Sequence, residues 1–431
     1  MDGAAVGAGA AVSGVSLGVE EEFLLVDGVS GECVPAAEAV LARAGGHRWE
    51  GSGGSFQDEL LASQVEAATG VCGDLAGLRA QVRFARARLA EAARACGLRL
   101  VSSGTPVMDG AAPPPARGGR FTRIAALYRG LIEDYQACGC HVHVGVADRE
   151  TAVAVVNHLR PWLGVLLALS ANSPFDHGRD SGYASRRLVE VSRFPGAGTP
   201  PWAASAAEYD RRVAMLVESG VLVDASMTFW LARPSPRWPT VEVRAADAAA
   251  TADEAVLQAA LVRALVRVAL ADLAAGREAP PVDAQLCAAG LWSAARYGMD
   301  GALVDPSAGR AVPAWRLLEG LLARLAPALE ETGDLAEVSA LVEGVRLAGT
   351  GARRQRRAAR RGRRSLVEAL ARQTESGTLP VPAPPAPPGA GFAAPAAGPA
   401  GHGLWDGLRD GVWGARERVS RPDARLSTEE T

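Results

Sequence analysis

A short stretch near the start of the chain, Gly18 to Val26, most constrains how this chain can fold. It reads Gly-Val-Glu-Glu-Glu-Phe-Leu-Leu-Val, which is typical of a β-strand but carries three consecutive glutamates. Because side chains alternate along a strand, Glu20 and Glu22 point to one face and Glu21 to the other. Two carboxylates side by side on a partly buried face repel each other unless a cation compensates them. A divalent metal suits such oxygen ligands; the alternative is a solvated strand end with surface glutamates.

The overall composition limits the chemistry that the chain can perform. Its 431 residues are 48% hydrophobic and carry a formal charge of −3, which allows a large core and gives no electrostatic footprint for a nucleic-acid partner. All 45 basic residues are arginines. The absence of lysine excludes P-loop, Schiff-base and kinase-type lysine chemistry. Any phosphate group would therefore be bound by arginine, metal or backbone N–H groups.

The cysteines and the apolar segments indicate where the protein resides. Six cysteines are scattered along the chain, and the N-terminus lacks the basic region of a secretory signal. Reduced thiols and a cytoplasmic location are therefore expected. The longest apolar run, around residues 162–171, is too short to span a bilayer, so no membrane partner is expected.

The pattern along the chain favours an α+β fold. Residues 1–15 are expected to be a disordered leader, and residues 376–431 a disordered Pro/Ala/Gly-rich tail. Between them, strands are followed by long helices without a regular βαβ period. The arginine run at residues 353–364 is interpreted as a solvated basic helix rather than an anion or nucleic-acid patch, because no aromatic residues interleave it. Helices are expected at 74–96, 121–135, 151–170 with a kink at Pro161, and 253–275, and strands at 98–103, 141–146, 225–231 and 240–245.

A second motif, Cys138 to Gly145, places two histidines on one strand face. His141 and His143 alternate with Cys140, so the thiols and imidazoles diverge and form a poor zinc cage. The two histidines offer metal ligands or phosphate donors instead. The alternative is a pair of packed polar core histidines.

A third motif, residues 233–247, puts Glu242 and Arg244 on one face of a strand. They form either an ordinary ion pair or a metal ligand beside a phosphate-binding arginine. Glu66 is a further acidic candidate, and the polar loop at residues 180–187 carries two guanidiniums suited to anion capture. Together these segments describe polar-faced strands that line an open sheet face, suited to a nucleoside triphosphate with two or more Mg²⁺ ions.

Taken in order, the motifs resemble the carboxylate–amine ligase family, also called the type 2 glutamate–cysteine ligase family. The match runs from about residue 16 to about residue 372. The segments that carry it are Gly18–Glu22, Cys138–Gly145, Ser170–Pro174, Arg233–Asp247, and Arg296–Gly301 followed by Asp305-Pro306.

This resemblance implies a single ligase domain at residues 16–375, with a fold similar to the catalytic part of glutamine synthetase: a curved antiparallel sheet with helices packed on it. It also implies that ATP phosphorylates the side-chain carboxylate of glutamate and that an amine, that of cysteine first of all, attacks the acyl phosphate. Three alternatives stay open: the same ATP chemistry on another carboxylate–amine pair, a low-turnover ATP- or metal-binding sensor, and a zinc hydrolase built on the histidines. A homo-oligomer is also left open.

The resemblance assigns roles to individual residues. His143 would lie near the transferred phosphoryl group, and Arg233 and Arg244 would act in catalysis and hold phosphate or carboxylate, with Arg187 a further candidate for that binding task. The metal ligands would be Glu20, Glu22, Glu66, His141 and Glu242.

Two departures from the family pattern concern the amino-acid substrate more than the ATP site. Relatives often have Gly-Thr-His-Pro where this chain has Gly104-Thr105-Pro106. Relatives often have Trp-Asp-Ile where this chain has Trp230-Leu231-Ala232, so an acidic residue is missing.

Overall fold

The computed structural model describes residues 14–47, 49, 53–110, 113–116, 118–133 and 135–380. The predicted leader and tail lie almost entirely outside these residues.

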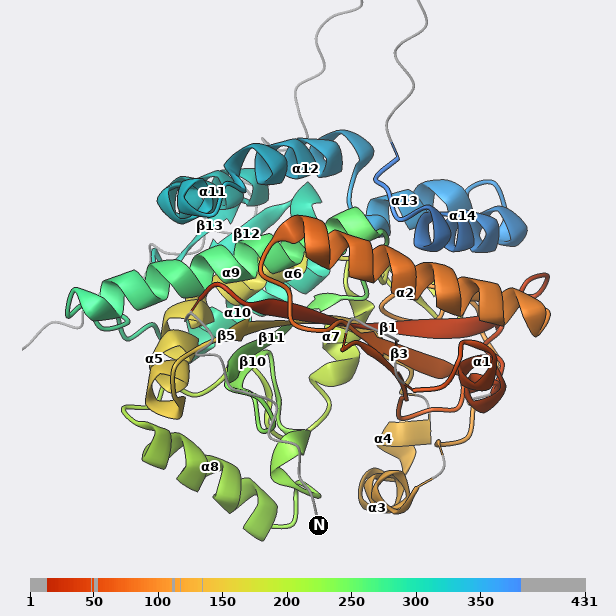
Figure 1. The fold of residues 1–431 in the computed structure, drawn as a ribbon, viewed down its shortest axis with the longest axis horizontal. Helices are drawn as coiled ribbons and strands as arrows, with labels where there is room; N and C mark the ends of the chain where they lie inside the picture. The colour runs from red at the N-terminus through yellow and green to blue at the C-terminus, as the bar shows by residue number, and fades with distance from the viewer. Residues whose placement is uncertain are drawn as a thin grey trace, which may run out of the picture. The chain divides into compact units, whose positions relative to one another are not determined.

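An antiparallel sheet of seven strands forms the centre of the fold (Figure 1). Its strand order is β10-β11-β5-β1-β3-β2, and β4 pairs with the second half of β1. The strands are β1 (Leu17–Asp27), β2 (Ser55–Asp58), β3 (Gln64–Ala68), β4 (Leu98–Val101), β5 (Gly139–Gly145), β10 (Ala232–Pro234) and β11 (Thr240–Asp247). The predicted α+β fold with an antiparallel sheet is confirmed.

The register of the central strands brings the acidic and histidine motifs together. Glu20 of β1 lies opposite His141 of β5, and Glu22 of β1 lies opposite Glu66 of β3. On the far side of β5, Glu242 of β11 lies opposite His143. Directly opposed residues in a sheet have neighbouring side chains, so these pairs share one face.

The other face of the sheet is buried against long helices. Cys140 and Val142 of β5 and Val243 of β11 belong to a large apolar cluster that includes most of α9 (Ala252–Ala274). Both α9 and α2 (Leu75–Ala95) run across this side of the sheet, while α8 (Ala206–Glu218) and the pair α3 (Gly119–Tyr128) and α4 (Gly130–Glu133) lie on the opposite side (Figure 1). The polar face of the sheet therefore lies on the side of α8 and of the pair α3 and α4, and these two groups flank it (Figure 1).

The remaining elements are short or pack farther from the site. They are α1 (Ala37–Arg43), α5 (Arg149–Leu159), η1 (Arg160–Trp162), α6 (Leu163–Ser170), β6 (Phe175–Asp176), β7 (Arg179–Asp180), α7 (Arg186–Val191), β8 (Ala197–Gly198), η2 (Ala225–Met227), β9 (Phe229–Trp230), α10 (Ala284–Tyr297), η3 (Gly298–Asp300), β12 (Ala302–Asp305), β13 (Arg310–Pro313), α11 (Ala314–Glu331), α12 (Leu335–Ala348), α13 (Gly351–Ala359) and α14 (Arg363–Ser376).

Local sequence signals explain several element boundaries. Asp74 caps α2 by accepting a hydrogen bond from the backbone N–H of Gly77. The expected kink at Pro161 is a 3₁₀ turn between α5 and α6. The predicted helix over 121–135 is interrupted at Arg129, which adopts φ = 45° and ends α3, and the short helix α4 follows at Gly130–Glu133. The predicted strand at 225–231 is also partly wrong: residues 225–227 form the 3₁₀ turn η2, whose Met227 packs in a separate apolar cluster.

The helical stretch Arg149–Ser170 is, by length and composition alone, apolar enough to cross a membrane, with a mean hydropathy of 1.5. It is longer than the apolar run noted in the sequence because α5 precedes α6. However, 78% of the scored stretch is buried within the protein, as in the core helix of a folded domain.

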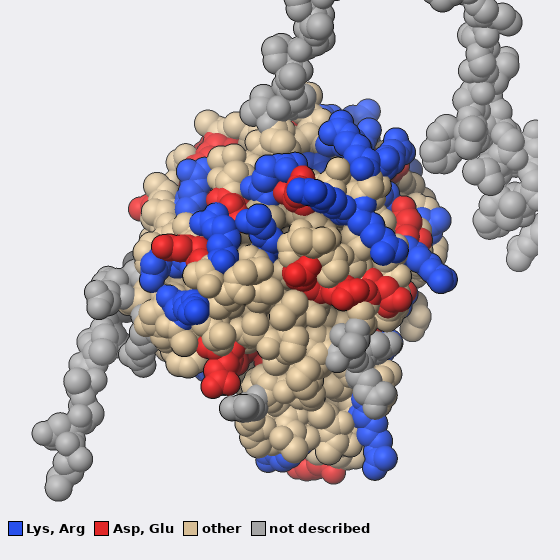
Figure 2. All heavy atoms as spheres, turned by 90° about the vertical axis from the view of Figure 1, so that its right-hand side faces the viewer, with Lys and Arg blue, Asp and Glu red and all other residues tan. Residues whose placement is uncertain are grey.

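The arginine run forms α13 and the start of α14. Figure 2 shows basic side chains, with acidic ones among them, over the face where α2 and α14 lie. Arg364 is exposed, as expected of a solvated basic helix, and pairs with Glu368. The prediction is wrong for Arg354, which is buried and forms an ion pair with Glu254 at 2.7 Å. This arginine joins α13 to α9 and is part of the core.

Candidate active site

The polar face of the sheet lines a cavity of about 870 Å³. Its lining includes carboxylates, a histidine and guanidiniums from the central strands and their flanking segments: Glu20, Glu22, Glu59, Glu66, His143, Arg187, Arg233, Glu242 and Arg244. All but Glu59 were predicted site residues. The ninth predicted residue, His141, is buried beside this group.

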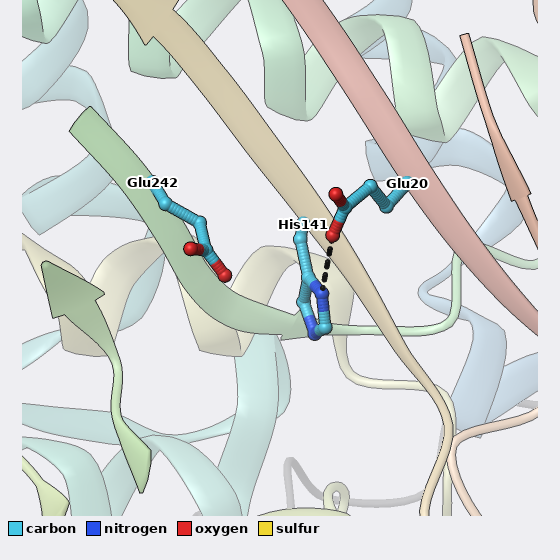
Figure 3. Close-up of side chains that lie close together, drawn as sticks. All are labelled: Glu20, His141 and Glu242. Carbon is cyan, nitrogen blue, oxygen red and sulfur yellow. Dashed lines mark hydrogen bonds and ion pairs between the residues drawn. The ribbon is translucent and has the colours of Figure 1, made fainter. Parts of the chain in front are cut away.

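One group of three potential metal ligands spans β1, β5 and β11. Glu20, His141 and Glu242 each offer an atom within 4.8 Å of the others, and Figure 3 shows the three side chains converging. The Nδ1 atom of His141 lies 3.3 Å from Oε2 of Glu20, while its Nε2 atom is buried without a hydrogen-bond partner. An unsatisfied buried imidazole nitrogen beside two carboxylates fits a divalent cation. We call this group the first triad.

A second triad consists of Glu22, Glu59 and Glu66, whose oxygens also lie within 4.8 Å of one another. Burial, the largest cause, and the charge of Glu22 raise the pKa of Glu59 to about 7. Burial and the neighbouring carboxylates Glu20, Glu59 and Glu22 raise the pKa of Glu66 well above its usual range. Three carboxylates that repel one another so strongly fit a bound cation.

Glu59 was missed by the sequence analysis. It follows β2 directly, outside any alternating pattern, and comes within reach of Glu66 because β2 pairs with β3. The available signal was the acidic pair Asp58-Glu59 at a strand end. That signal alone does not distinguish a ligand from a surface carboxylate.

Two arginines hold Glu242 in its ionised form. Arg233 donates from Nε to Oε2 at 2.9 Å and from Nη2 to Oε1 at 3.1 Å, and Arg244 also donates to Oε1. Burial opposes ionisation, but the charges of Arg233 and Arg244 outweigh it and hold the pKa of Glu242 well below its usual range. Arg233 also donates to the carbonyls of Ser226 and Thr228, so most of its donors bind protein groups.

The two histidines have opposite protonation tendencies. Burial, and then the charge of Arg244, lower the pKa of His141, which favours the neutral form that a metal requires. Burial also opposes the charged form of His143, but the hydrogen bond and charge of Glu20 outweigh it and raise the pKa of His143. Its Nδ1 atom lies 2.9 Å from Oγ1 of Thr240. His143 is therefore the better cation of the two.

Arg187 lies in the cavity wall, but its setting differs from the predicted loop. Both Arg186 and Arg187 belong to the first turn of α7, where Ser185 caps the helix by accepting from the N–H of Leu188. The guanidinium of Arg187 is buried, and both terminal nitrogens donate to the carbonyl of Arg244 at 3.3 Å. The predicted loop at residues 180–187 is wrong for its last two residues, because Ser185 caps a short helix that begins at Arg186.

Two other acidic residues of the motifs form buried contacts around the site. Asp247, at the end of β11, is fully buried and accepts hydrogen bonds from the N–H of Asn172 and the hydroxyls of Ser173 and Ser185. Glu21 points away from the cavity, as predicted, and Arg86 of α2 donates to its carboxylate at 2.6 and 3.0 Å. No local pattern predicts Arg86 as the counter-ion of Glu21, because Arg86 lies on a different element.

The cysteines of the second motif take no part in the triads. Cys140 belongs to the apolar cluster on the opposite sheet face, and burial raises the pKa of its thiol. The predicted divergence of thiols and imidazoles is confirmed.

The first departure from the family pattern, at Gly104-Thr105-Pro106, lies outside the cavity wall. Thr105 is buried and donates a hydrogen bond to the carbonyl of Phe175, and neither Thr105 nor Pro106 is among the residues lining the cavity.

The fold is shared with solved ligases. The glutamate–cysteine ligase from Francisella tularensis, solved in complex with AMP, superposes with a TM-score of 0.60 at 13% identity, covering 85% of this chain and 90% of that one. This similarity shows that the two proteins share a fold.

The sequence comparisons identify the family. The model of glutamate–cysteine ligase family 2 matches residues 16–377. Two relatives from Saccharopolyspora erythraea carry provisional assignments as glutamate–cysteine ligases 2-2 and 2-1. They are 55% and 47% identical over 365 and 352 residues, covering 84% and 81% of this chain and 93% and 91% of theirs. The chain therefore belongs to glutamate–cysteine ligase family 2 and is an ATP-dependent carboxylate–amine ligase of this type.

Proposed function

We propose that the enzyme joins the side-chain carboxylate of glutamate to the amine of cysteine. The γ-phosphoryl group of ATP passes to a carboxylate oxygen, which gives an acyl phosphate and ADP. The amine nitrogen then attacks the carbonyl carbon, loses a proton and displaces inorganic phosphate. The observation that carries this proposal is the pair of ligand triads on one sheet face, flanked by His143 and guanidiniums. The resemblance to relatives assigned as glutamate–cysteine ligases supports the choice of substrates.

The donor sets suit Mg²⁺. Glu20, His141 and Glu242 would hold one ion, and Glu22, Glu59 and Glu66 a second. When bound, such ions neutralise charge on the transferring phosphate.

The chain's own residues would bind and orient the anionic groups. His143, whose pKa is raised by Glu20, presents a positive charge beside the first triad. Arg244 lines the cavity, and its guanidinium interacts electrostatically with Glu242, Glu22 and Glu20, so it adds positive charge to the same space. Arg233 holds the carboxylate of Glu242 by a bidentate ion pair and thereby positions this ligand of the first triad. Preorganised charges of this kind lower the barrier to phosphoryl transfer.

The test is ADP release by purified protein with Mg²⁺ and ATP, given glutamate alone, cysteine alone, or both, followed by a panel of other amines. Release that requires both amino acids supports the proposal. Release with glutamate and a different amine would indicate another carboxylate–amine pair. Such a change of substrate would agree with the absence of the acidic residue that relatives often have within Trp230–Ala232. Tight nucleotide binding without turnover for any pair would indicate a sensor.

A further inference from the structure

The arginine run at residues 353–364 carries a dense positive charge that the proposed reaction does not use. It contains eight arginines and no acidic residue. Arg354 pairs with Glu254 inside the core, and Arg364 pairs with Glu368. Four further arginines are exposed and pair with no carboxylate in the described part of the chain: Arg357, Arg360, Arg361 and Arg363. The protein therefore leaves much of the charge of this run unmatched.

The unmatched charges crowd one another along α13. Arg353, Arg357 and Arg360 follow one another at intervals of four and three residues, which places them on one face of the helix. Like charges at this spacing destabilise a helix. Burial, and then the charges of Arg353 and Arg354, lower the pKa of Arg357. A bound anion would relieve this repulsion, so the basic face has the charge of a site for an extended anionic partner.

Aromatic side chains of another helix lie beside this basic face. Arg353 contacts Asp300 of η3 at 3.4 Å, and η3 directly follows Tyr297, the last residue of α10. Tyr297 is 41% exposed, and Trp292 of the same helix is 52% exposed. Their rings pack edge-on against each other, with centroids 5.9 Å apart. Two exposed rings thus adjoin the start of the basic face.

A second set of contacts joins these rings to α13. Arg356 donates to both carboxylate oxygens of Asp180 at 2.7 Å and to the carbonyl of Tyr183 at 2.9 Å. The guanidinium of Arg296 lies over the Tyr183 ring at 5.7 Å and over the Tyr297 ring at 5.2 Å. Exposed rings and unmatched guanidiniums therefore share one continuous region. We call it the arginine–aromatic surface, defined by six residues: Trp292, Tyr297, Arg357, Arg360, Arg361 and Arg363.

Tertiary contacts supply the aromatic residues that the arginine run lacks in the sequence. The prediction of a merely solvated helix depends on that lack, but α10 places two exposed rings beside the run. An acidic protein surface would match only the guanidiniums. A single-stranded nucleic acid matches both kinds of group, because its phosphates bind guanidiniums and its unpaired bases stack on aromatic rings.

We propose that the arginine–aromatic surface binds single-stranded nucleic acid, with backbone phosphates on the arginines and bases stacked on Trp292 and Tyr297. Recognition of phosphates and base faces specifies no base sequence. The formal charge of −3 for the whole chain does not oppose this binding, because the positive charge is local. None of the six residues is among those that line the cavity, so the proposal is independent of the proposed ligase reaction.

The probe is a fluorescently labelled single strand of about 16 thymidines, and its binding to the full-length protein is followed by anisotropy. Four neutralised phosphates predict that the logarithm of the affinity falls with the logarithm of the salt concentration with a slope of about −3 between about 50 and 200 mM. Replacing Arg360, Arg361 and Arg363 together by glutamine should reduce this slope by about 2, because each contact contributes about 0.7. Trp292→Ala should weaken binding about 5- to 150-fold and leave the slope unchanged.

Matched control variants come from the region of α8, which lies on the opposite side of the sheet from α13 (Figure 1). Arg211→Gln removes another exposed arginine that pairs with no carboxylate in the described part of the chain, and Trp202→Ala removes another partly exposed tryptophan. Both controls should keep the wild-type affinity and slope. Circular dichroism and ADP release should be unchanged in every variant. If the triple variant fails to fold, Arg361→Gln and Trp292→Ala decide the question.

The absence of binding at about 50 mM salt, or an unchanged slope in the triple variant, would overturn the proposal. Equally tight binding of a glutamate homopolymer would also overturn it and would indicate an acidic protein partner. Equally tight binding of a duplex of the same length, or equal losses in Trp292→Ala and Trp202→Ala, would refute the stacking of bases on this surface.

Discussion

Replacing Glu59 by glutamine removes the carboxylate that completes the second triad. In the metal-free protein, the folded state keeps a proton on Glu59 at pH values where the unfolded chain has released it. The free energy of unfolding therefore falls as the pH rises between about 4.5 and about 7, and the loss is complete above that range. Glutamine stays neutral throughout, so the variant lacks this contribution.

The magnitude follows from the two pKa values. The gap between the usual 4.5 and about 7, at about 1.4 kcal/mol per pH unit, corresponds to about 3 kcal/mol. Metal-free wild-type protein should lose about 3 kcal/mol more than Glu59→Gln between pH 4.5 and pH 8. Saturating Mg²⁺ should abolish most of this difference, because the ion replaces the protons as the compensating charge.

The assay is urea unfolding in EDTA at several pH values, repeated with Mg²⁺. Asp58→Asn serves as the control, because it removes an exposed carboxylate from the adjacent position. ADP release should fall at least tenfold in Glu59→Gln and stay near the wild-type value in Asp58→Asn. The reasoning is refuted if Glu59→Gln and wild type show the same pH dependence in EDTA, or if Glu59→Gln keeps full turnover.

Three further outcomes are expected. Glu20→Gln, Glu22→Gln and Glu242→Gln, which each change one ligand of a triad, should each abolish most ADP release while circular dichroism shows an intact fold. Normal turnover in all three variants would exclude the metal-site model. Glu21→Gln should lower the free energy of unfolding by about 3–5 kcal/mol, because it leaves the buried Arg86 without its counter-charge; chemical denaturation measures this, and a loss below about 1 kcal/mol would contradict it. A chain ending at Pro380 should release ADP at the wild-type rate, because it keeps the hydrogen bond from the N–H of Leu379 to Asp253; a folded but inactive truncation would show that the removed segment contributes.

Most of the site residues that could be predicted lie on alternating strands, and Arg187 of α7 is the exception. The period of two is a local property, so the sequence alone placed Glu20 with Glu22, His141 with His143, and Glu242 with Arg244 on shared faces. It also placed Glu21 on the opposite face, where the structure finds it paired with Arg86. The alternating pattern predicts to which face of the sheet each side chain points. For a site built on one sheet face, this is sufficient to find most of the residues.

The residues that could not be predicted depend on contacts between distant segments. Glu59 enters the second triad only because β2 pairs with β3. Arg187 is a predicted candidate, but its close approach to β5, which Gly139 allows because it lacks a side chain, could not be predicted. The absence of aromatic residues from the arginine run predicts a solvated position for Arg354, but Glu254 of α9 pairs with it in the core. Each of these contacts depends on tertiary register, which one local pattern does not determine.

The two triads differ in how the protein balances their charge, and this difference bears on metal binding. In the first triad, hydrogen bonds from His141 and His143 outweigh burial and lower the pKa of Glu20, and Arg233 and Arg244 do the same for Glu242. In the second triad, burial and mutual repulsion raise the pKa values of Glu59 and Glu66. Protons therefore compete with a cation mainly at the second triad. The apparent affinity for Mg²⁺ there should rise with pH between 6 and 8 while that of the first triad stays nearly constant, and titration calorimetry with wild type and Glu59→Gln would contradict this if both proteins showed one pH-independent class of sites.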